Sequence, residues 1–334
     1  MQAKLLRLAM RLAFFLRDCI SPRKCDPTFT QKIPSQYGLG PGQISLHFYT
    51  PPSYRTRRRH GHQFPVVVNF HGGGFCLGTA TDDGGWARVV LKELQCVLVS
   101  VGYRRAPEYP YPAAVDDSVT ALRYLEARAS DLSIDMSKVV LSGFNAGANL
   151  AFSLPLRLFS DQHDGNCRGH GSDESATNII AIVAFYPLLD WSTSRDSKRR
   201  RSKRPDKTLP KFLTDLIDHS YLPAERSYFS PGDELSTAPT VSPALAPDDW
   251  LKHGLPNNIQ FILCGWDMLL DEGQTFAKRL RQLGKTVDEV VIPEVVHGWD
   301  KNPNPLFDTE SIDAIYTKAC RDLLTTFRTI DGES

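Results

Sequence analysis

The sequence has no long apolar run and almost no net charge. Its 334 residues include 39 Lys or Arg and 38 Asp or Glu, so the formal net charge at pH 7 is +1. That balance creates no global field that would favour nucleic acid or an anionic membrane. No stretch is long and apolar enough to cross a bilayer. These absences predict a globular chain with no nucleic-acid partner and no stable membrane span.

The cysteines do not form the patterns of a disulfide framework. Their count is odd and no Cys-x-x-Cys pair occurs. Several lie in apolar, strand-like runs, where a free cysteine packs as a small hydrophobe. We therefore expect reduced thiols and a cytoplasmic location. The seven are Cys19, Cys25, Cys76, Cys96, Cys167, Cys264 and Cys320.

A metal site is not expected either. The segment 161–177 is rich in Gly, Ser, Asp and His, which predicts a surface insertion. It contains His163, Cys167 and His170, but no fourth ligand has the spacing that would close a site. The sequence predicts no metal and no cofactor.

The N-terminal segment is apolar but interrupted by charge. A signal peptide needs an unbroken apolar region and a small-residue cleavage site, and neither is present. A helix packed over the domain is the preferred interpretation, and a helix on a membrane surface is the alternative. The interrupting residues are Lys4, Arg7, Arg11, Arg17 and Asp18.

Apolar runs alternate with amphipathic segments along most of the chain. This alternation predicts an α/β fold with a mostly parallel sheet and helices on both faces. Residues 1–334 are expected to form a single domain, with a helical cap formed by about 1–40 and 191–246. We predict an edge strand at 44–49, buried strands at 64–70, 96–101, 138–141, 179–186, 259–264 and 287–292, and helices at 82–94, 113–128, 146–159, 211–221, 276–283 and 312–327.

Two basic runs interrupt the pattern. The run 55–62 is interpreted as a solvated hairpin tip, and 198–204 as an exposed loop. A nuclear-import or phosphate-binding patch is the alternative for 198–204.

The segment 139–150 has the strongest local signal. An apolar run leads into Gly-x-Asn-x-Gly, and a helix-forming run follows. Gly-x-Ser-x-Gly in this context is the nucleophile elbow, a sharp strand-to-helix turn that carries a nucleophilic serine. Here the middle residue is Asn145. The turn holds its residue at positive φ, which asparagine tolerates better than most residues.

Other parts of an ester-cleaving site are present. The glycine run after strand 64–70 lets backbone amides approach a carbonyl oxygen, and we expect Gly73, Gly74 and Ala146 to supply them. Asp267 follows strand 259–264, and His297 follows the last strand. Along the chain the elbow comes first, then Asp267, then His297. This order is that of enzymes in which a carboxylate orients a histidine that acts as a base.

Five motifs in order resemble the hormone-sensitive-lipase branch of the α/β-hydrolases, which includes bacterial esterases, plant carboxylesterases and fungal esterases. The resemblance covers about residues 65–297. It implies an α/β-hydrolase fold in which Asp267 is the acid, His297 the base and Gly73, Gly74 and Ala146 the oxyanion hole. The motifs are HGGGF at 71–75, YRRAPE at 103–108, GFNAGANL at 143–150, DMLLDEG at 267–273 and HGW at 297–299.

This sequence departs from the family at the elbow. Asn145 stands where the family has its serine, and Phe144 where an aspartate is usual; Ala148 and Arg105 also differ. A carboxamide is not a competent nucleophile. Losing a triad serine costs about a million-fold in a well-studied protease, which leaves too little activity for a dedicated esterase. Residues expected to contact the substrate are His71, Gly72, Phe75, Phe144 and Trp299.

The preferred hypothesis is therefore an enzyme of another reaction class. His297 and Asp267 would act as general acid and base, and Asn145 would hydrogen-bond the substrate. Elimination, isomerisation, condensation or cyclisation of a carbonyl compound would fit, and relatives of plant carboxylesterases have turned to dehydration and cyclisation, which suits secondary metabolism. Apolar cap residues suggest an apolar or aromatic small molecule.

Two alternatives remain open. The chain could be a small-molecule binding protein, as are the gibberellin receptors of the same branch. It could also be a carboxylesterase inactivated by a deliberate serine-to-asparagine change. A homodimer is possible.

Overall fold

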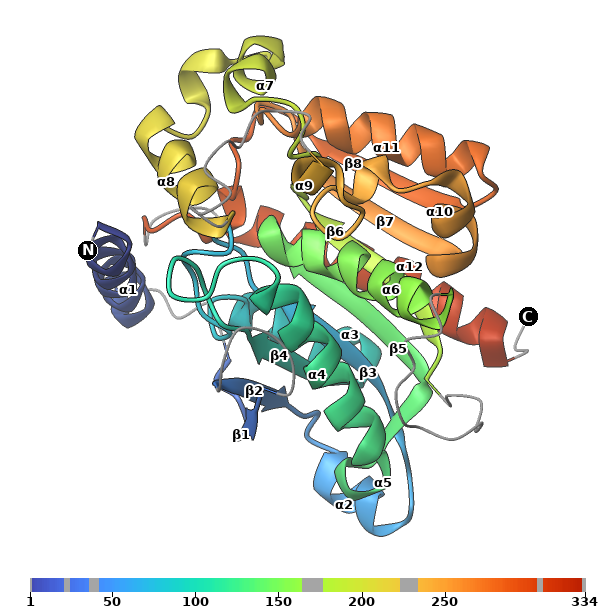
Figure 1. Ribbon diagram of the computed structural model, residues 1–334. Coiled ribbons are helices and arrows are strands. Elements are labelled where there is room, and N and C mark those ends of the chain that lie inside the picture. Colours follow the sequence, from blue (N-terminus) through green and yellow to red (C-terminus); the bar gives the residue numbers. More distant parts are fainter. Residues whose placement is uncertain are drawn as a thin grey trace.

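The computed structural model describes residues 2–20, 25–35, 42–163, 177–222, 234–304 and 309–331. Its centre is an eight-stranded sheet in the order β1-β2-β4-β3-β5-β6-β7-β8 (Figure 1). β2 is antiparallel to both of its neighbours, and all pairs from β4 to β8 are parallel. The predicted fold class is confirmed. The strands are β1 (Phe29–Pro34), β2 (Gln43–Tyr49), β3 (Phe64–Phe70), β4 (Val97–Gly102), β5 (Ile134–Phe144), β6 (Ile179–Phe185), β7 (Asn258–Cys264) and β8 (Thr286–Ile292).

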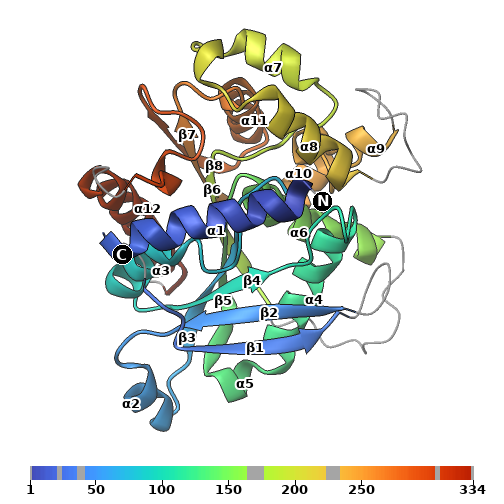
Figure 2. The same cartoon turned by 90° about the vertical axis from the view of Figure 1, so that its left-hand side faces the viewer.

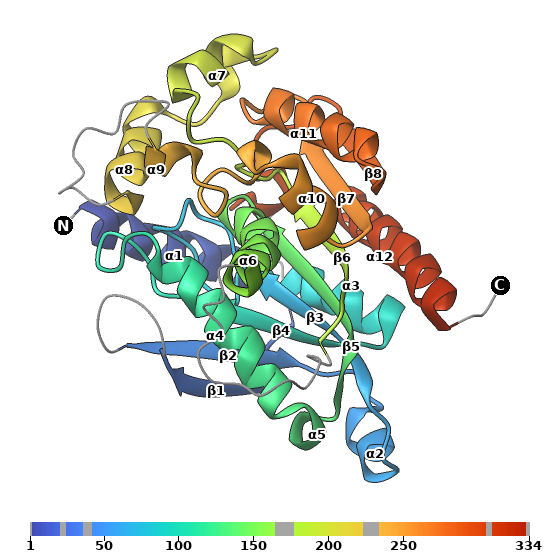
Figure 3. The ribbon, with the colours of Figure 1, turned by 45° about the vertical axis from the view of Figure 1, so that its right-hand side comes forward.

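Helices cover both faces of the sheet (Figure 3). One apolar cluster lies between the sheet and α4, α6, α10 and α11, and a second lies under α3 and α12. The central strands are buried on both faces, which explains their continuous apolar runs. The helices are α1 (Gln2–Ile20), α2 (Tyr54–Arg59), α3 (Gly84–Leu94), α4 (Ala113–Ala127), α5 (Ala129–Leu132), α6 (Ala146–His163), α7 (Arg195–Arg201), α8 (Lys211–Tyr221), α9 (Glu234–Thr237), α10 (Asp248–Gly254), α11 (Leu270–Gln282) and α12 (Glu310–Asp331), with short 3₁₀ turns at Pro205–Lys207, Pro243–Leu245 and Trp299–Lys301.

The turn from β5 to α6 is held by close backbone packing. A Cβ on Gly147 would lie 1.9 Å from the carbonyl oxygen of Phe70, and one on Gly143 would lie 2.3 Å from the carbonyl carbon of Gly147. Both positions therefore require glycine. The start of α6 is thereby pressed against the end of β3, where the loop 71–75 begins.

Three predictions about elements are wrong. Strand 44–49 is not at the edge, because β1 pairs outside it; residues 29–34 thus belong to the sheet and not to the predicted cap. Residues 54–59 form α2 instead of a hairpin tip, and 195–201 form α7 instead of an exposed loop. Most of the predicted insertion, 164–176, lies outside the described residues.

The cap interpretation of the remaining segments stays a prediction. Figures 1 and 2 show α7 and α8 over one end of the sheet, with α1 beside α8. Among the helices in the described part of the chain, none is long and apolar enough to cross a membrane.

Candidate functional site

Asn145 lies at the tip of the β5–α6 turn with φ of 51°, in the left-handed region. Its amide donates to the carbonyl of Phe185 at 2.9 Å, and its own carbonyl accepts from Asn149 at 3.1 Å. Its side-chain Oδ1 accepts a hydrogen bond from the amide of Gly74 at 3.1 Å. Because a backbone N–H can only donate, this contact fixes which end of the carboxamide faces Gly74. The carboxamide thus occupies a donor that the sequence assigns to an oxyanion.

Ser142 does not replace the missing serine. It lies within β5 and is fully buried. Its hydroxyl donates to Oδ1 of Asn69 at 2.8 Å and accepts from Nε1 of Trp86 at 3.2 Å. Ser142 is a core residue.

The structure brings His297 and Asp267 together. Nδ1 of His297 lies 2.6 Å from Oδ2 of Asp267, whose other oxygen accepts from the amide of Leu269 at 3.0 Å. Since a carboxylate only accepts, Nδ1 carries a proton, and in the neutral ring Nε2 would keep its lone pair. The arrangement is that of an imidazole oriented as a base.

The segment after β6 links this pair to the elbow. Phe185 accepts from the amide of Asn145, and the ring of the next residue, Tyr186, meets His297 edge-on at 4.9 Å between centroids. Tyr186 was missed at the sequence level. Its position directly after a buried strand was the one available signal.

The glycine loop packs against α8. Gly73 and Gly74 have φ of 109° and 59°, where other residues are strained. A Cβ on Gly74 would lie 2.6 Å from Cδ1 of Ile217. Phe75 is fully buried and stacks on Tyr221 at 3.8 Å. Apolar α8 side chains therefore close directly over the predicted oxyanion loop.

Four residues predicted to contact substrate are buried, and Phe75, described above, is one of them. Phe144 is 0% exposed and stacks on Phe185 at 4.3 Å, within the cluster under α3 and α12. Trp299 is 4% exposed in the same cluster. The predicted substrate contact does not fit either side chain. The strand alternation directs Phe144 away from the elbow tip, which sequence spacing alone did not reveal.

His71 is also buried. It is 1% exposed and stacks on Tyr103 at 4.2 Å, with Nδ1 2.8 Å from the carbonyl of Gly72. Burial lowers the pKa of His71 to about 4, so the ring is neutral at physiological pH. The His71 side chain supports the glycine loop from inside the protein. Its burial argues against the predicted contact with substrate. Gly72 remains partly exposed.

A buried charge cluster lies behind the elbow. Nζ of Lys301 is 2.8 Å from Asp83, 3.0 Å from Asp300 and 3.7 Å from the centre of the Phe144 ring. Asp300 also accepts from the hydroxyl of Tyr186 at 2.7 Å. Burial raises the pKa of Asp83 to about 6, and the Lys301 ammonium opposes that rise. The cluster therefore connects Tyr186, whose ring packs on His297, to Phe144, which precedes Asn145.

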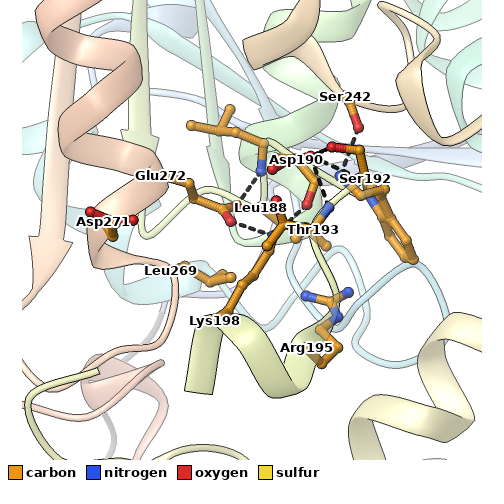
Figure 4. A network of polar contacts seen from close by, with 12 residues as sticks. Leu188, Asp190, Ser192, Thr193, Arg195, Lys198, Ser242, Leu269, Asp271 and Glu272 are labelled. Carbon is orange, nitrogen blue, oxygen red and sulfur yellow. Dashed lines mark hydrogen bonds and ion pairs between the residues drawn. The ribbon is translucent and has the colours of Figure 1, made fainter. Parts of the chain in front are cut away.

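A second buried network joins α7 to α11, the helix that follows the loop carrying Asp267 (Figure 4). Lys198 of α7 donates to the carbonyl of Asp190 and forms an ion pair with Glu272 of α11. Glu272 also accepts from the amide of Leu189 at 2.8 Å. Burial lowers the pKa of Lys198 and raises that of Glu272, and each partner opposes the other's shift. Residue 198 is therefore a structural cation and not part of an exposed basic patch.

A cavity of about 160 Å³ lies between α7 and α11. It is lined by residues of the network and by Met268 and Phe276, but not by Asn145, His297 or the glycine loop. The charged groups that line it include Lys198 with Glu272 and Arg201 with Asp271, which are already paired. It is separate from the elbow.

Within the described residues, no group of three or more His, Cys, Asp or Glu side chains is arranged to hold a metal ion. The predicted ligand types Cys167 and His170 lie outside them. Five described cysteines are free thiols, and the reduced location stays a prediction.

Comparisons with known proteins agree with this geometry. Residues 67–301 match a family model described as the alpha/beta hydrolase fold. The chain is 30% identical to carboxylesterase NlhH of Mycobacterium tuberculosis over 257 residues, which are 77% of this chain and 71% of that protein. It is 43% identical to the versiconal hemiacetal acetate esterase of Aspergillus parasiticus over 143 residues, or 43% of this chain and 38% of that one.

Solved structures give the same result. A bacterial heroin esterase has a TM-score of 0.74 at 25% identity, covering 95% of this chain and 90% of that one. An esterase from Pyrobaculum calidifontis has a TM-score of 0.73 at 25% identity, covering 96% and 92%. A fungal esterase from Rhizomucor miehei, with a TM-score of 0.75 at 21% identity, supports the fold alone.

Proposed function

This chain belongs to the carboxylesterase-like branch of the α/β-hydrolase family, and from that premise we propose that it is an enzyme that moves protons on a carbonyl-containing small molecule. The observation that carries the proposal is the 2.6 Å contact between His297 and Asp267 beside an elbow without a nucleophile. The chain has a histidine base and an aspartate that orients it. Asn145, with a carboxamide side chain, stands where the family has its nucleophilic serine.

Two features of Asn145 argue against acyl transfer. Its amide nitrogen has no lone pair available for attack at neutral pH. Its Oδ1 accepts from Gly74, so an ester carbonyl could bind that amide only after displacing the side chain. Because Ala146 opens α6, its amide has no acceptor within the helix and stays suited to bind a developing oxyanion.

The proposed chemistry uses the groups that remain. Nε2 of His297 removes a proton from the carbon next to a substrate carbonyl, and the imidazolium that forms is stabilised by Asp267. The oxygen of the resulting enolate is held by the amides of Gly73 and Ala146. Returning the proton at another atom gives isomerisation, and expelling a neighbouring group gives elimination.

The relatives guide the choice of substrates. Those compared are named as esterases, and one is named for a hemiacetal acetate. The apolar side chains of α8, the helix that packs on the glycine loop, favour an apolar or aromatic compound. We therefore propose aromatic ketones and hydroxy-ketones as the first panel, with aryl acetates as the hydrolytic comparison.

Proton transfer can be measured without knowing the natural product. The chain is incubated with each ketone in D₂O, and loss of the α-proton signal is followed by NMR. We expect exchange with at least one ketone, and its abolition in His297→Gln. Wild type should give no burst with aryl acetates, whereas Asn145→Ser should gain hydrolysis by about a hundredfold or more.

A small-molecule binding protein is the second candidate, and the occupied Gly74 amide favours it. The two candidates separate at His297. If ketones bind equally well to wild type and His297→Gln but neither catalyses exchange, the acid–base proposal is wrong and the binding role stands. Rapid stoichiometric acylation of wild type would contradict both.

A further inference from the structure

Helix α1 is apolar on two faces. Its inner face is docked on the domain: Ala3 is 3% exposed, and Leu6 and Met10 pack against the core. The guanidinium of Arg7 donates to the carbonyl of Cys76 at 2.7 Å and pairs with Glu108 at 2.9 Å. The helix is thus held beside the loop that follows the glycine run.

The outer face of α1 carries most of the exposed apolar surface. Nine large apolar side chains are exposed among the described residues, and five of them lie on α1. At 3.6 residues per turn, these five fall within about a third of the helix circumference. They are Leu5 at 61%, Leu8 at 65%, Leu12 at 58%, Phe15 at 63% and Leu16 at 54%. A continuous exposed stripe of this kind indicates a binding surface.

The charges next to this stripe select its partner. Lys4 and Arg11 are exposed at its border; Lys4 lies 3.8 Å from Glu108, and no acidic residue of the chain occurs between positions 1 and 17. In a two-fold contact between copies of this chain, each α1 would bring its cations against those of the other, which is unfavourable. An apolar stripe bordered by cations suits the headgroup region of an anionic bilayer.

We propose that α1 attaches the protein peripherally to an anionic phospholipid surface through the face defined by Leu5, Leu8, Leu12, Phe15 and Leu16. The helix lies in the interface plane and does not span it. Figures 1 and 2 both show α1 next to α8, so attachment would hold the cap side of the molecule at the lipid. An apolar substrate dissolved in the membrane would then be released close to the predicted site.

The test uses the full chain and vesicles of phosphatidylcholine with or without phosphatidylserine. We expect co-sedimentation with the anionic vesicles that weakens at high salt. The double change Leu8→Ser and Leu12→Ser should reduce the bound fraction about tenfold or more, because it removes two exposed side chains that would enter the lipid. Arg11→Gln should weaken binding to the anionic vesicles selectively. Ile330→Ser, an exposed apolar residue of α12, is the matched control and should bind like wild type.

Light scattering on the same proteins tests the alternative that a second copy of this chain covers the stripe. If wild type is a dimer, the double variant a monomer, and neither binds vesicles, the stripe is a self-association surface and the proposal is overturned. Equal binding of wild type and the double variant would also overturn it. Circular dichroism confirms that the variants fold, and ketone exchange without vesicles should be unchanged, so this test is independent of the proposed reaction.

Discussion

Residue 144 explains why restoring the family sequence would fail. Phe144 fills the space between Phe185 and the ring of Tyr316, with Lys301 over its face. We expect Phe144→Asp to destabilise the fold by about 3–5 kcal/mol, because it removes a buried ring and buries a carboxylate. Urea unfolding of both proteins measures this. Phe144→Leu should cost less, and an Asp variant as stable as wild type would show that Lys301 compensates fully. Asn145→Ser alone is therefore the better test of the site.

His71 predicts a pH dependence of stability. Burial lowers its pKa from an ordinary 6.5 to about 4, so between these pH values the unfolded chain binds a proton that the folded chain does not. Its contribution is complete above pH 6.5 and is lost as pH falls towards 4, by up to about 3 kcal/mol. His71→Phe keeps a ring on Tyr103 but cannot titrate. Unfolding free energies at pH 7 and pH 4.5 should differ less for His71→Phe than for wild type. The exposed His60→Gln is the control; an unchanged difference in His71→Phe would contradict the assignment.

At the scale of elements, the ion pair between Lys198 and Glu272 joins α7 to the helix that follows the acid loop. Both side chains are nearly buried, with 3% and 10% exposed. Lys198→Met leaves Glu272 buried and unpaired, and we expect a loss of about 3–5 kcal/mol. Adding Glu272→Gln should recover much of it, because Gln can still accept from Leu189. A double-mutant cycle in urea checks this. Additive losses would mean that the two charges do not depend on each other.

Periodicity predicted the central elements because each strand is buried along its length and each helix has one buried face. Strand 64–70 and helix 211–221 have the predicted bounds. β1 was missed because its side chains alternate between exposed and half-buried, so only Ile33 is buried. Helix α7 was missed because five of its seven residues are basic, and only the contact of Lys198 with Glu272 shows why one of them is buried. Such partners are 74 positions apart in the sequence, from 198 to 272, and no local pattern encodes them.

At the scale of the whole molecule, the site is assembled from strand ends that are distant in sequence. The order of elbow, acid and histidine correctly brought His297 to Asp267, because parallel strands present their carboxyl ends at one edge. The assignment of Asn145 to the substrate could not foresee that its oxygen already accepts from Gly74. Contacts between a side chain and a distant backbone amide depend on loop geometry. The roles assigned to these residues remain predictions.

The basic run 198–204 does not form an unpaired cationic surface. The overall net charge is only +1, and four cations of the run have acidic partners. Those contacts leave no large cationic field for a polyanion to neutralise. The pairs are Lys198 with Glu272, Arg199 with Asp196, Arg201 with Asp271 and Arg204 with Asp206.

We therefore expect no shift of duplex DNA in a gel assay at physiological salt. A triple variant that replaces Asp196, Asp206 and Asp271 with Asn leaves three arginines without their carboxylates and raises the local charge by three. It should gain weak binding that disappears as salt increases, because such binding depends on counterion release. These three acids lie at exposed pairs, so the fold should be retained. If wild type itself binds DNA, and Arg200→Gln with Lys203→Gln abolishes the shift, the run is a binding patch in spite of its ion pairs.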